Sequence, residues 1–279
     1  MVEIMLPALV AAMILLSLHA YQGIHVIARG IIFVDLAIAQ MAALGWTAAT
    51  FVGFEAGSTG AYFIGLLTSL LAAGLFSVTR MDHRYITQEA IIGIVFVVAS
   101  AATILLASQA PRGAEHVEAL LTGSLLWVTW PKIARIGAVY AVLGLLHWLL
   151  RRRFLTISLQ PELAKSAGWS IKGWDFLFYA LFGVMVTLSV DVAGVLLVFS
   201  FLVIPAVVAF LFAGRPRALL AIAWLAGTVA TVAGLLVSYM ADLPTGPVVV
   251  CAFAAVLLTA FALRRLSGGR RPPVSEATL

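Results

Sequence analysis

An aspartate and a glutamine lie inside an apolar stretch of the chain, GIIFVDLAIAQMAALG (residues 30–45). An ionised carboxylate in hydrocarbon costs several kcal/mol, so Asp35 needs a partner or a polar surrounding. Carboxylate oxygens are also hard ligands that suit divalent cations. The small residues of this stretch indicate that it packs against other helices and does not simply face lipid. We therefore favour Asp35 and Gln40 as residues of a cation path. The alternative is a helix-start acid whose charge is satisfied by local donors or by Arg29.

Two further groups of side chains are candidates for contact with a cation. His19 lies in the first apolar segment, and its neutral imidazole would suit zinc, although a lone membrane histidine more often hydrogen-bonds to a neighbouring helix. Glu115, His116 and Glu118 form an acid–imidazole–acid cluster whose field would attract a cation at an outer entrance. The polar start of a helix would give the same residues. We keep His19 as a candidate path residue and the cluster as a candidate entrance.

The composition places these residues in a membrane protein with many spans. Of the 279 residues, 63% are hydrophobic and 10% are charged, whereas about a quarter of the residues of a soluble domain are charged. The run from Trp174 to Phe212 is too long for one span and has a natural reversal near Asp191, so we divide it there. We predict an all-α integral membrane fold of about nine transmembrane helices, with eight possible. The candidate spans lie near residues 4–26, 30–52, 60–79, 89–108, 133–150, 174–190, 192–212, 218–240 and 246–263.

The basic residues predict the orientation of these spans. With the N-terminus outside and the C-terminus in the cytoplasm, fourteen of the 17 Lys and Arg residues fall on the inner side. Only Arg112, Lys132 and Arg135 fall outside, as the positive-inside rule expects. We predict one transmembrane domain over residues 1–263 and a basic, disordered cytoplasmic tail over residues 264–279.

The sequence lacks the motifs of ATP binding and of common hydrolases. It contains no G-x-x-x-x-G-K-[ST] loop, no H-E-x-x-H and no G-x-S-x-G. We therefore expect no catalytic residues in this chain. Intramembrane charge is sparse, essentially Asp35 with Asp191 at a turn, whereas proton- and sodium-coupled transporters usually place carboxylates at mid-depth. This scarcity favours a path whose energy comes from another protein.

One inner loop, residues 156–173, has the features of a docking element. Pro161 at the first helical position and Glu162 in the first turn favour a helix start, and Gly168 favours its end. A helix of about two turns is too short to be stable alone and needs a surface to pack on. An amphipathic connector lying on the lipid headgroups is the alternative. The residues expected to face a partner are Leu163, Ala164 and Ala167.

Four stretches occur in an order that resembles a known family. They are GIHVIARGIIFVDLAIAQMAALG (23–45), ITQEAIIGIVF (86–96), QPELAKSAG (160–168) and VDVAGVLLVFSFLVIPAVVA (190–209). The chain resembles, over nearly its whole length, the membrane permease subunits of zinc- and manganese-type metal-ion ABC importers.

The resemblance implies partners and a location. It implies a homodimeric permease in the cytoplasmic (inner) membrane of a bacterium or archaeon, with one ABC ATPase subunit docked under each copy through residues 160–168. An extracytoplasmic metal-binding protein would deliver the cargo. No covalently bound cofactor and no nucleic acid is implied, and ATP would act only through the partner subunit. The residues of this coupling element would be Pro161, Glu162, Leu163, Ala164 and Gly168.

The second span departs from the family pattern. Members commonly carry Gly-Asp-x-x-x-His there, with a glycine five residues after the histidine. Here Gln40, five residues before Gly45, takes the place of the histidine, and Leu36 takes the place of the aspartate. On an ideal helix, Asp35 and Gln40 point about 140° apart. The usual pair of ligands is therefore broken, and the metal is not named by the sequence.

The family segment 190–209 contains two candidate gating kinks. Gly194 opens its Gly-x-Leu-Leu run, and Pro205 removes a backbone hydrogen bond inside a span. The resemblance, together with the topology, implies the translocation-path subunit of an ATP-driven importer of a divalent metal ion such as zinc, manganese or iron. The alternatives are a stand-alone secondary cation transporter or channel, and a metal-chelate ABC permease.

Overall fold

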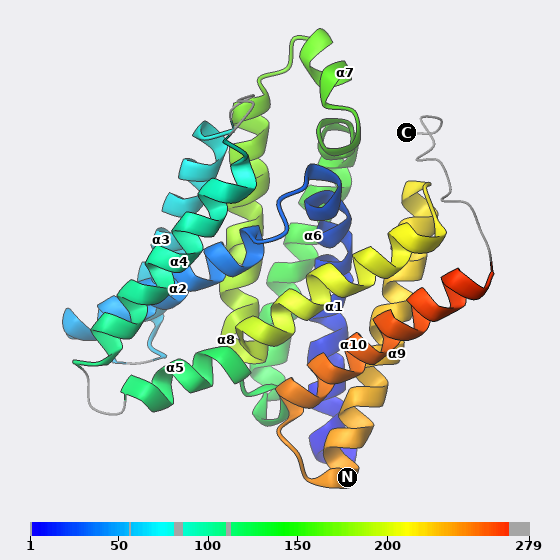
Figure 1. Cartoon of the computed structure of the whole chain (residues 1–279). Coiled ribbons are helices and arrows are strands. Elements are labelled where there is room, and N and C mark those ends of the chain that lie inside the picture. Colours follow the sequence, from blue (N-terminus) through cyan, green and yellow to red (C-terminus); the bar gives the residue numbers. More distant parts are fainter. Residues whose placement is uncertain (1, 56, 81–85, 110–112, 268–279) are drawn as a thin grey trace. The chain divides into compact units, whose positions relative to one another are not determined.

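The computed structural model describes residues 2–55, 57–80, 86–109 and 113–267, and all regular structure in this part of the chain is helical (Figure 1). Eight helices of the described part are long and apolar enough to cross a membrane. The prediction of an all-α membrane protein with eight or nine spans is confirmed, and its orientation stays a prediction. The elements are α1 (Val2–Arg29), α2 (Val34–Phe51), α3 (Thr59–Val78), α4 (Gln88–Ala107), α5 (Gly113–Thr122), the 3₁₀ turn η1 (Leu125–Trp127), α6 (Trp130–Leu159), α7 (Pro161–Ser166), α8 (Ile171–Phe212), α9 (Pro216–Ala241) and α10 (Thr245–Leu266).

The chain divides into two compact units. Unit 1 comprises residues 1–28, 122–152 and 192–279, and unit 2 comprises residues 29–121 and 153–191. Helices α1, α6 and α8 each contribute residues to both. The predicted tail lies outside the described residues from 268 onward, and α10 continues the helix to Leu266.

In unit 2, helix α2 packs on both α3 and α4 (Figure 1). Glycines allow the backbones of α2 and α3 to approach: a Cβ added to Gly45 would overlap Thr68 Oγ1 and lie 2.7 Å from Gly65 Cα. Thr68 Oγ1 also donates to the carbonyl of Met41 at 2.7 Å, so a hydrogen bond joins the two helices. Small residues at helix contacts are typical of membrane bundles. The prediction that this span packs against other helices is confirmed.

Helix α8 contains an interruption. Its 42 residues would be roughly 63 Å long, about twice the thickness of the hydrocarbon core. Gly194 has φ 75° and ψ 160°, which is not helical, and it lies three residues beyond the predicted reversal at Asp191. Pro205 lies within the helical segment that follows. Of the two predicted kinks, the backbone therefore departs from helical geometry at Gly194 and not at Pro205.

The segment before η1 docks onto this interruption, within unit 1. Ser124 N donates to the carbonyl of Val192 at 3.0 Å. Gly123 has φ +70°, and a Cβ added there would overlap the backbone of Ala193 and Gly194. Only a residue without a side chain fits this contact.

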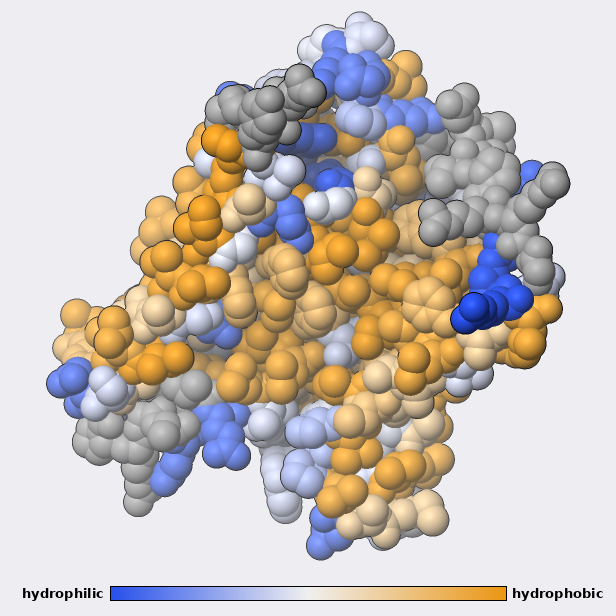
Figure 2. Space-filling view, in the orientation of Figure 1, coloured by the Kyte–Doolittle hydropathy of each residue, from blue (hydrophilic) through white to orange (hydrophobic). Residues whose placement is uncertain are grey.

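Apolar side chains cover much of the face seen in Figure 2. Large apolar residues are exposed along the spans, which is the expected surface for helices in contact with lipid. The chain is therefore a multi-pass membrane protein. Examples with more than half of the residue exposed are Leu67, Leu71, Val97, Val98 and Leu105.

Candidate functional site

Asp35 is buried in the first turn of α2, with 1% of its surface exposed. Neither carboxylate oxygen has a hydrogen-bond partner among the described residues. Buried polar groups are almost always paired, so this is an unusual state. The alternative that Arg29 satisfies Asp35 is wrong, because the Arg29 guanidinium pairs with Asp175 instead. Both oxygens of Asp35 therefore keep their capacity to accept a hydrogen bond or to bind a cation.

Gln40 lies in the same helix, half-buried. Because α2 is regular from Val34 to Phe51, the expected angle of about 140° between Asp35 and Gln40 stands. Helix α2 therefore does not bring the two side chains to one face. Within the described residues, no three His, Cys, Asp or Glu side chains come together so as to hold a metal ion.

His19 belongs to unit 1 and is fully buried on α1. Its Nδ1 lies 2.8 Å from the carbonyl oxygen of Leu15 and therefore carries the proton it donates there. The hydroxyl of Tyr140 lies 3.4 Å from the same nitrogen. Nε2 has no partner among the described residues, which leaves a lone pair for a metal or a proton.

Another buried imidazole, that of His147, lies in unit 1, although its place near the inner end of a span predicts an interfacial residue. His147 Nδ1 lies 2.8 Å from the carbonyl oxygen of Leu143, and His147 Nε2 lies 2.7 Å from Gln22 Nε2. Since the carbonyl can only accept, Nδ1 donates and Nε2 accepts from the Gln22 amide. Gln22 is three residues after His19 on α1, so both face the same way. That spacing of polar residues on an apolar helix was the available signal.

The predicted entrance cluster lies on helix α5. Glu115 and Glu118 are both exposed, and their spacing of three residues places them on one face of the helix. His116 lies in the same helix. Their role as an entrance stays a prediction.

The predicted docking helix is present as α7, Pro161–Ser166, with proline at its start. Lys165 Nζ lies 3.0 Å from Glu162 Oε1, one turn apart. Gly168 follows with φ +71°, a left-handed conformation that ends a helix and that glycine adopts without strain. The sequence signals for its start and end are confirmed.

The prediction that Ala164 faces a partner is wrong. Leu163 is 53% exposed and Ala167 is exposed, as predicted, but Ala164 is fully buried. A helix of six residues must seat one side on the protein, since it is too short to be stable alone. Ala164 therefore anchors α7, and Leu163 is the large apolar residue that it presents.

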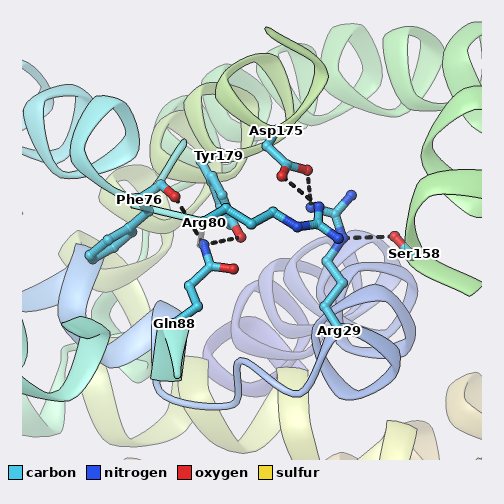
Figure 3. A network of polar contacts seen from close by, with 7 residues as sticks. All are labelled: Arg29, Phe76, Arg80, Gln88, Ser158, Asp175 and Tyr179. Atoms are coloured by element: carbon cyan, nitrogen blue, oxygen red, sulfur yellow. Dashed lines mark hydrogen bonds and ion pairs between the residues drawn. The ribbon is translucent and has the colours of Figure 1, made fainter. Parts of the chain in front are cut away.

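The two chain segments that flank α7 meet in a buried ionic network (Figure 3). Arg29 Nη1 lies 2.9 Å from Asp175 Oδ1, and Arg80 Nη1 lies 2.5 Å from Asp175 Oδ2. Arg29 Nε donates to Ser158 Oγ at 2.7 Å. The Asp175 side chain is fully buried and that of Arg29 is 3% exposed. The guanidinium of Arg29 also lies 3.9 Å from the ring centre of Phe178, a cation–π distance.

A family model, that of the ABC 3 transport family, matches residues 1–264. The chain belongs to the ABC 3 transport family. It is 25% identical over 268 residues to the high-affinity zinc uptake system membrane protein ZnuB of Haemophilus influenzae, covering 95% of this chain and 100% of ZnuB. It is 25% identical over 257 residues to the chelated iron transport system membrane protein YfeC of Yersinia pestis, covering 92% and 85%. The predicted permease family is confirmed.

Solved structures are similar to this ABC 3 family chain in fold. PsaBC from Streptococcus pneumoniae, solved in complex with Fab, superposes with a TM-score of 0.76 at 23% sequence identity. The match covers 91% of this chain and 90% of that chain. At this identity the likeness concerns the fold alone.

The ionic network of this ABC 3 family chain was not foreseen. Gln88 extends it, with Nε2 donating to the carbonyl of Phe76 at 2.9 Å and to the hydroxyl of Tyr179 at 3.1 Å (Figure 3). The available signal was Asp175 itself, an acid at the second position of a predicted apolar span. An acid there needs a partner, but the sequence did not say which one.

Proposed function

We propose that the chain forms the translocation path of an ATP-driven importer of a divalent metal ion, zinc, manganese or iron. The observation that carries this proposal is Asp35, a buried carboxylate without a partner in an ABC 3 family chain. An unpaired ionised carboxylate costs several kcal/mol inside a membrane protein. A cation that passes through would compensate this cost and gain a hard oxygen ligand.

His19 and Gln40 are the other proposed path residues. His19 would offer the lone pair of Nε2, and Gln40 its amide oxygen. Imidazole nitrogen suits zinc and neighbouring first-row divalent ions. His19 in unit 1 and Gln40 in unit 2 are proposed separately and not as one ligand set. The two relatives are named for zinc and for chelated iron, which supports a metal cargo without choosing among metals.

Energy for transport would come from a separate ABC ATPase subunit. We assign its docking site to α7, where Leu163 is exposed and Ala164 holds the helix on unit 2. ATP binding would draw the α7 helices of two permease copies together and change the side to which the path opens. The non-helical residue Gly194 is the proposed gating position in α8.

Delivery of the metal would occur on the outer side. With the N-terminus outside and the C-terminus in the cytoplasm, α5 faces outward, and Glu115, His116 and Glu118 would attract the ion released by an external binding protein. The location would be the inner membrane of a bacterium or archaeon.

Metal uptake by reconstituted vesicles tests the path. The permease, its ATPase and its binding protein would be assembled in liposomes and supplied with radioactive zinc or manganese. We expect Asp35→Asn to lower uptake about tenfold or more, the effect of losing one charged ligand. The matched control is Asp242→Asn, because Asp242 is exposed, and asparagine tolerates its left-handed backbone. Unchanged uptake in Asp35→Asn would refute the path assignment.

Co-purification tests the partner. A tagged chain extracted gently from its native membrane should bring a nucleotide-binding subunit with it, and Leu163→Asp should remove that subunit. Ion flux through the purified chain alone, without an ATPase, would instead favour a secondary transporter or channel. Uptake only of a chelated metal would favour the metal-chelate permease.

A further inference from the structure

We propose that Arg29 is a positioning residue that connects the coupling helix α7 to the α1–α2 junction and thereby to Asp35. The inference rests on the proposed function, because it describes how movement of a docked ATPase would reach the metal path. All residues that it uses belong to unit 2.

On one side, Arg29 holds both ends of the segment that carries α7. Ser158 lies in the last turn of α6, just before α7, and Asp175 lies in α8, just after it. Nε of Arg29 donates to Ser158 at 2.7 Å while Nη1 donates to Asp175 at 2.9 Å (Figure 3). Since one planar guanidinium makes both bonds, the base of α7 cannot shift relative to Arg29 without breaking one of them.

On the other side, a short linker, residues 30–33, joins Arg29 to the helix that carries Asp35. Arg29 ends α1, and α2 begins at Val34. The linker between them turns at Gly30, φ +66°, and its last residue, Phe33, donates its backbone N–H to Glu89 Oε1 at 3.0 Å. A displacement of Arg29 therefore reaches the first turn of α2, where Asp35 lies, unless the linker of residues 30–33 absorbs it.

Burial makes this connection rigid. The side chain of Arg29 is 3% exposed and lies against the ring of Phe178. A buried ion pair is not in itself a gain in stability, because an apolar replacement is often as stable. What the arginine adds is a set of directional hydrogen bonds between the segments that flank α7 and the α1–α2 junction. A connected network becomes a coupling path only when coupling is measured.

The structure supplies a matched control for that measurement. Arg80 binds the other oxygen of the same carboxylate, Asp175 Oδ2, and its side chain is 26% exposed. It follows the end of α3, and its ion pair joins it to α8 and not to the α1–α2 linker. Loss of Arg80 therefore removes one ion pair of Asp175 and leaves the connection from α7 to Asp35 in place.

The test compares metal uptake with ATP hydrolysis in the same vesicles. The permease would be reconstituted with its ATPase and binding protein, and zinc or manganese ions would be the transported probe. We expect Arg29→Gln to retain hydrolysis but to lower the metal taken up per ATP about tenfold, the effect of losing a charged hydrogen bond. Arg29→Lys should restore part of this ratio, because it keeps the pair with Asp175. Arg80→Gln should leave the ratio within about twofold of wild type.

Two outcomes would overturn the role of Arg29. One is a proportionate loss of uptake and hydrolysis in Arg29→Gln, and the other is equal uncoupling by Arg80→Gln. If Arg29→Gln does not assemble, Ser158→Ala is the deciding variant, since it removes one hydroxyl and leaves both ion pairs. An unchanged ratio of metal uptake to ATP hydrolysis in Ser158→Ala refutes the proposal, and a ratio lowered a few-fold supports it. A wild-type complex without ATP-dependent uptake would overturn the proposed function and this inference with it.

Discussion

Replacing Asp175 by asparagine is the sharpest test of the ionic network. Asparagine keeps the size of the side chain and removes its charge, which leaves Arg29, 3% exposed, without a counter-ion among the described residues. Removing one partner of a buried ion pair costs about 3–5 kcal/mol, because the remaining charge is buried and uncompensated. Arg80 is 26% exposed and can be hydrated, so nearly all of this cost comes from Arg29.

Thermal unfolding of the purified full chain in detergent measures this cost. One kcal/mol shifts the midpoint by about 2–4 °C in proteins of 150–250 residues, so we expect Asp175→Asn to unfold about 6–20 °C below wild type. Arg80→Gln should lower the midpoint by only a few degrees. The double variant Arg29→Met/Asp175→Leu should recover most of the loss, since it buries no charge. A midpoint for Asp175→Asn equal to that of wild type, or a double variant no better than the single one, would refute the argument from burial.

Three further substitutions have expected outcomes in the same unfolding assay. Asp35→Asn should leave the midpoint unchanged or raise it, because the carboxylate has no partner to lose; a clear drop would reveal a stabilising contact. Gly23→Ala should destabilise by about 1–3 kcal/mol, since its Cβ would overlap the carbonyl of Leu202, and a wild-type midpoint would show that α1 can move away. Gly123→Ala should cost more than Gly23→Ala, because the backbone has φ +70° and the Cβ would also overlap Ala193; equal costs would contradict the added strain.

The fold could be predicted because the membrane restricts it. Apolar segments of about 20 residues have few alternatives to helices when no water can satisfy the backbone. The reversal placed near Asp191 came within three residues of the non-helical Gly194. The length of the segment alone required a break there. The sequence could not have given the contact of Gly123 with that break, because the two segments meet only in the folded chain.

The candidate site could be predicted only where its signals are local. The start and end of α7 follow from Pro161 and Gly168, which act within one or two turns. The buried face of α7 could not be predicted in this way, since six residues have too little periodicity to show that Ala164 is buried. The pairing of Arg29 with Asp175 joins positions 146 residues apart, and no pattern in a single sequence reports such a contact.

The buried pair of Gln22 and His147 has a consequence for spectroscopy. The carbonyl of Leu143 fixes the proton of the imidazole on Nδ1, so Nε2 carries no proton and accepts a hydrogen bond from the Gln22 amide. A second proton on the ring would place two donors against each other unless the amide turned over. The protonation state of His147 and the orientation of the Gln22 amide therefore change together. The two ring-nitrogen resonances of His147 report that state, so nitrogen NMR of the labelled protein in lipid would measure the charge of this imidazole without any mutation.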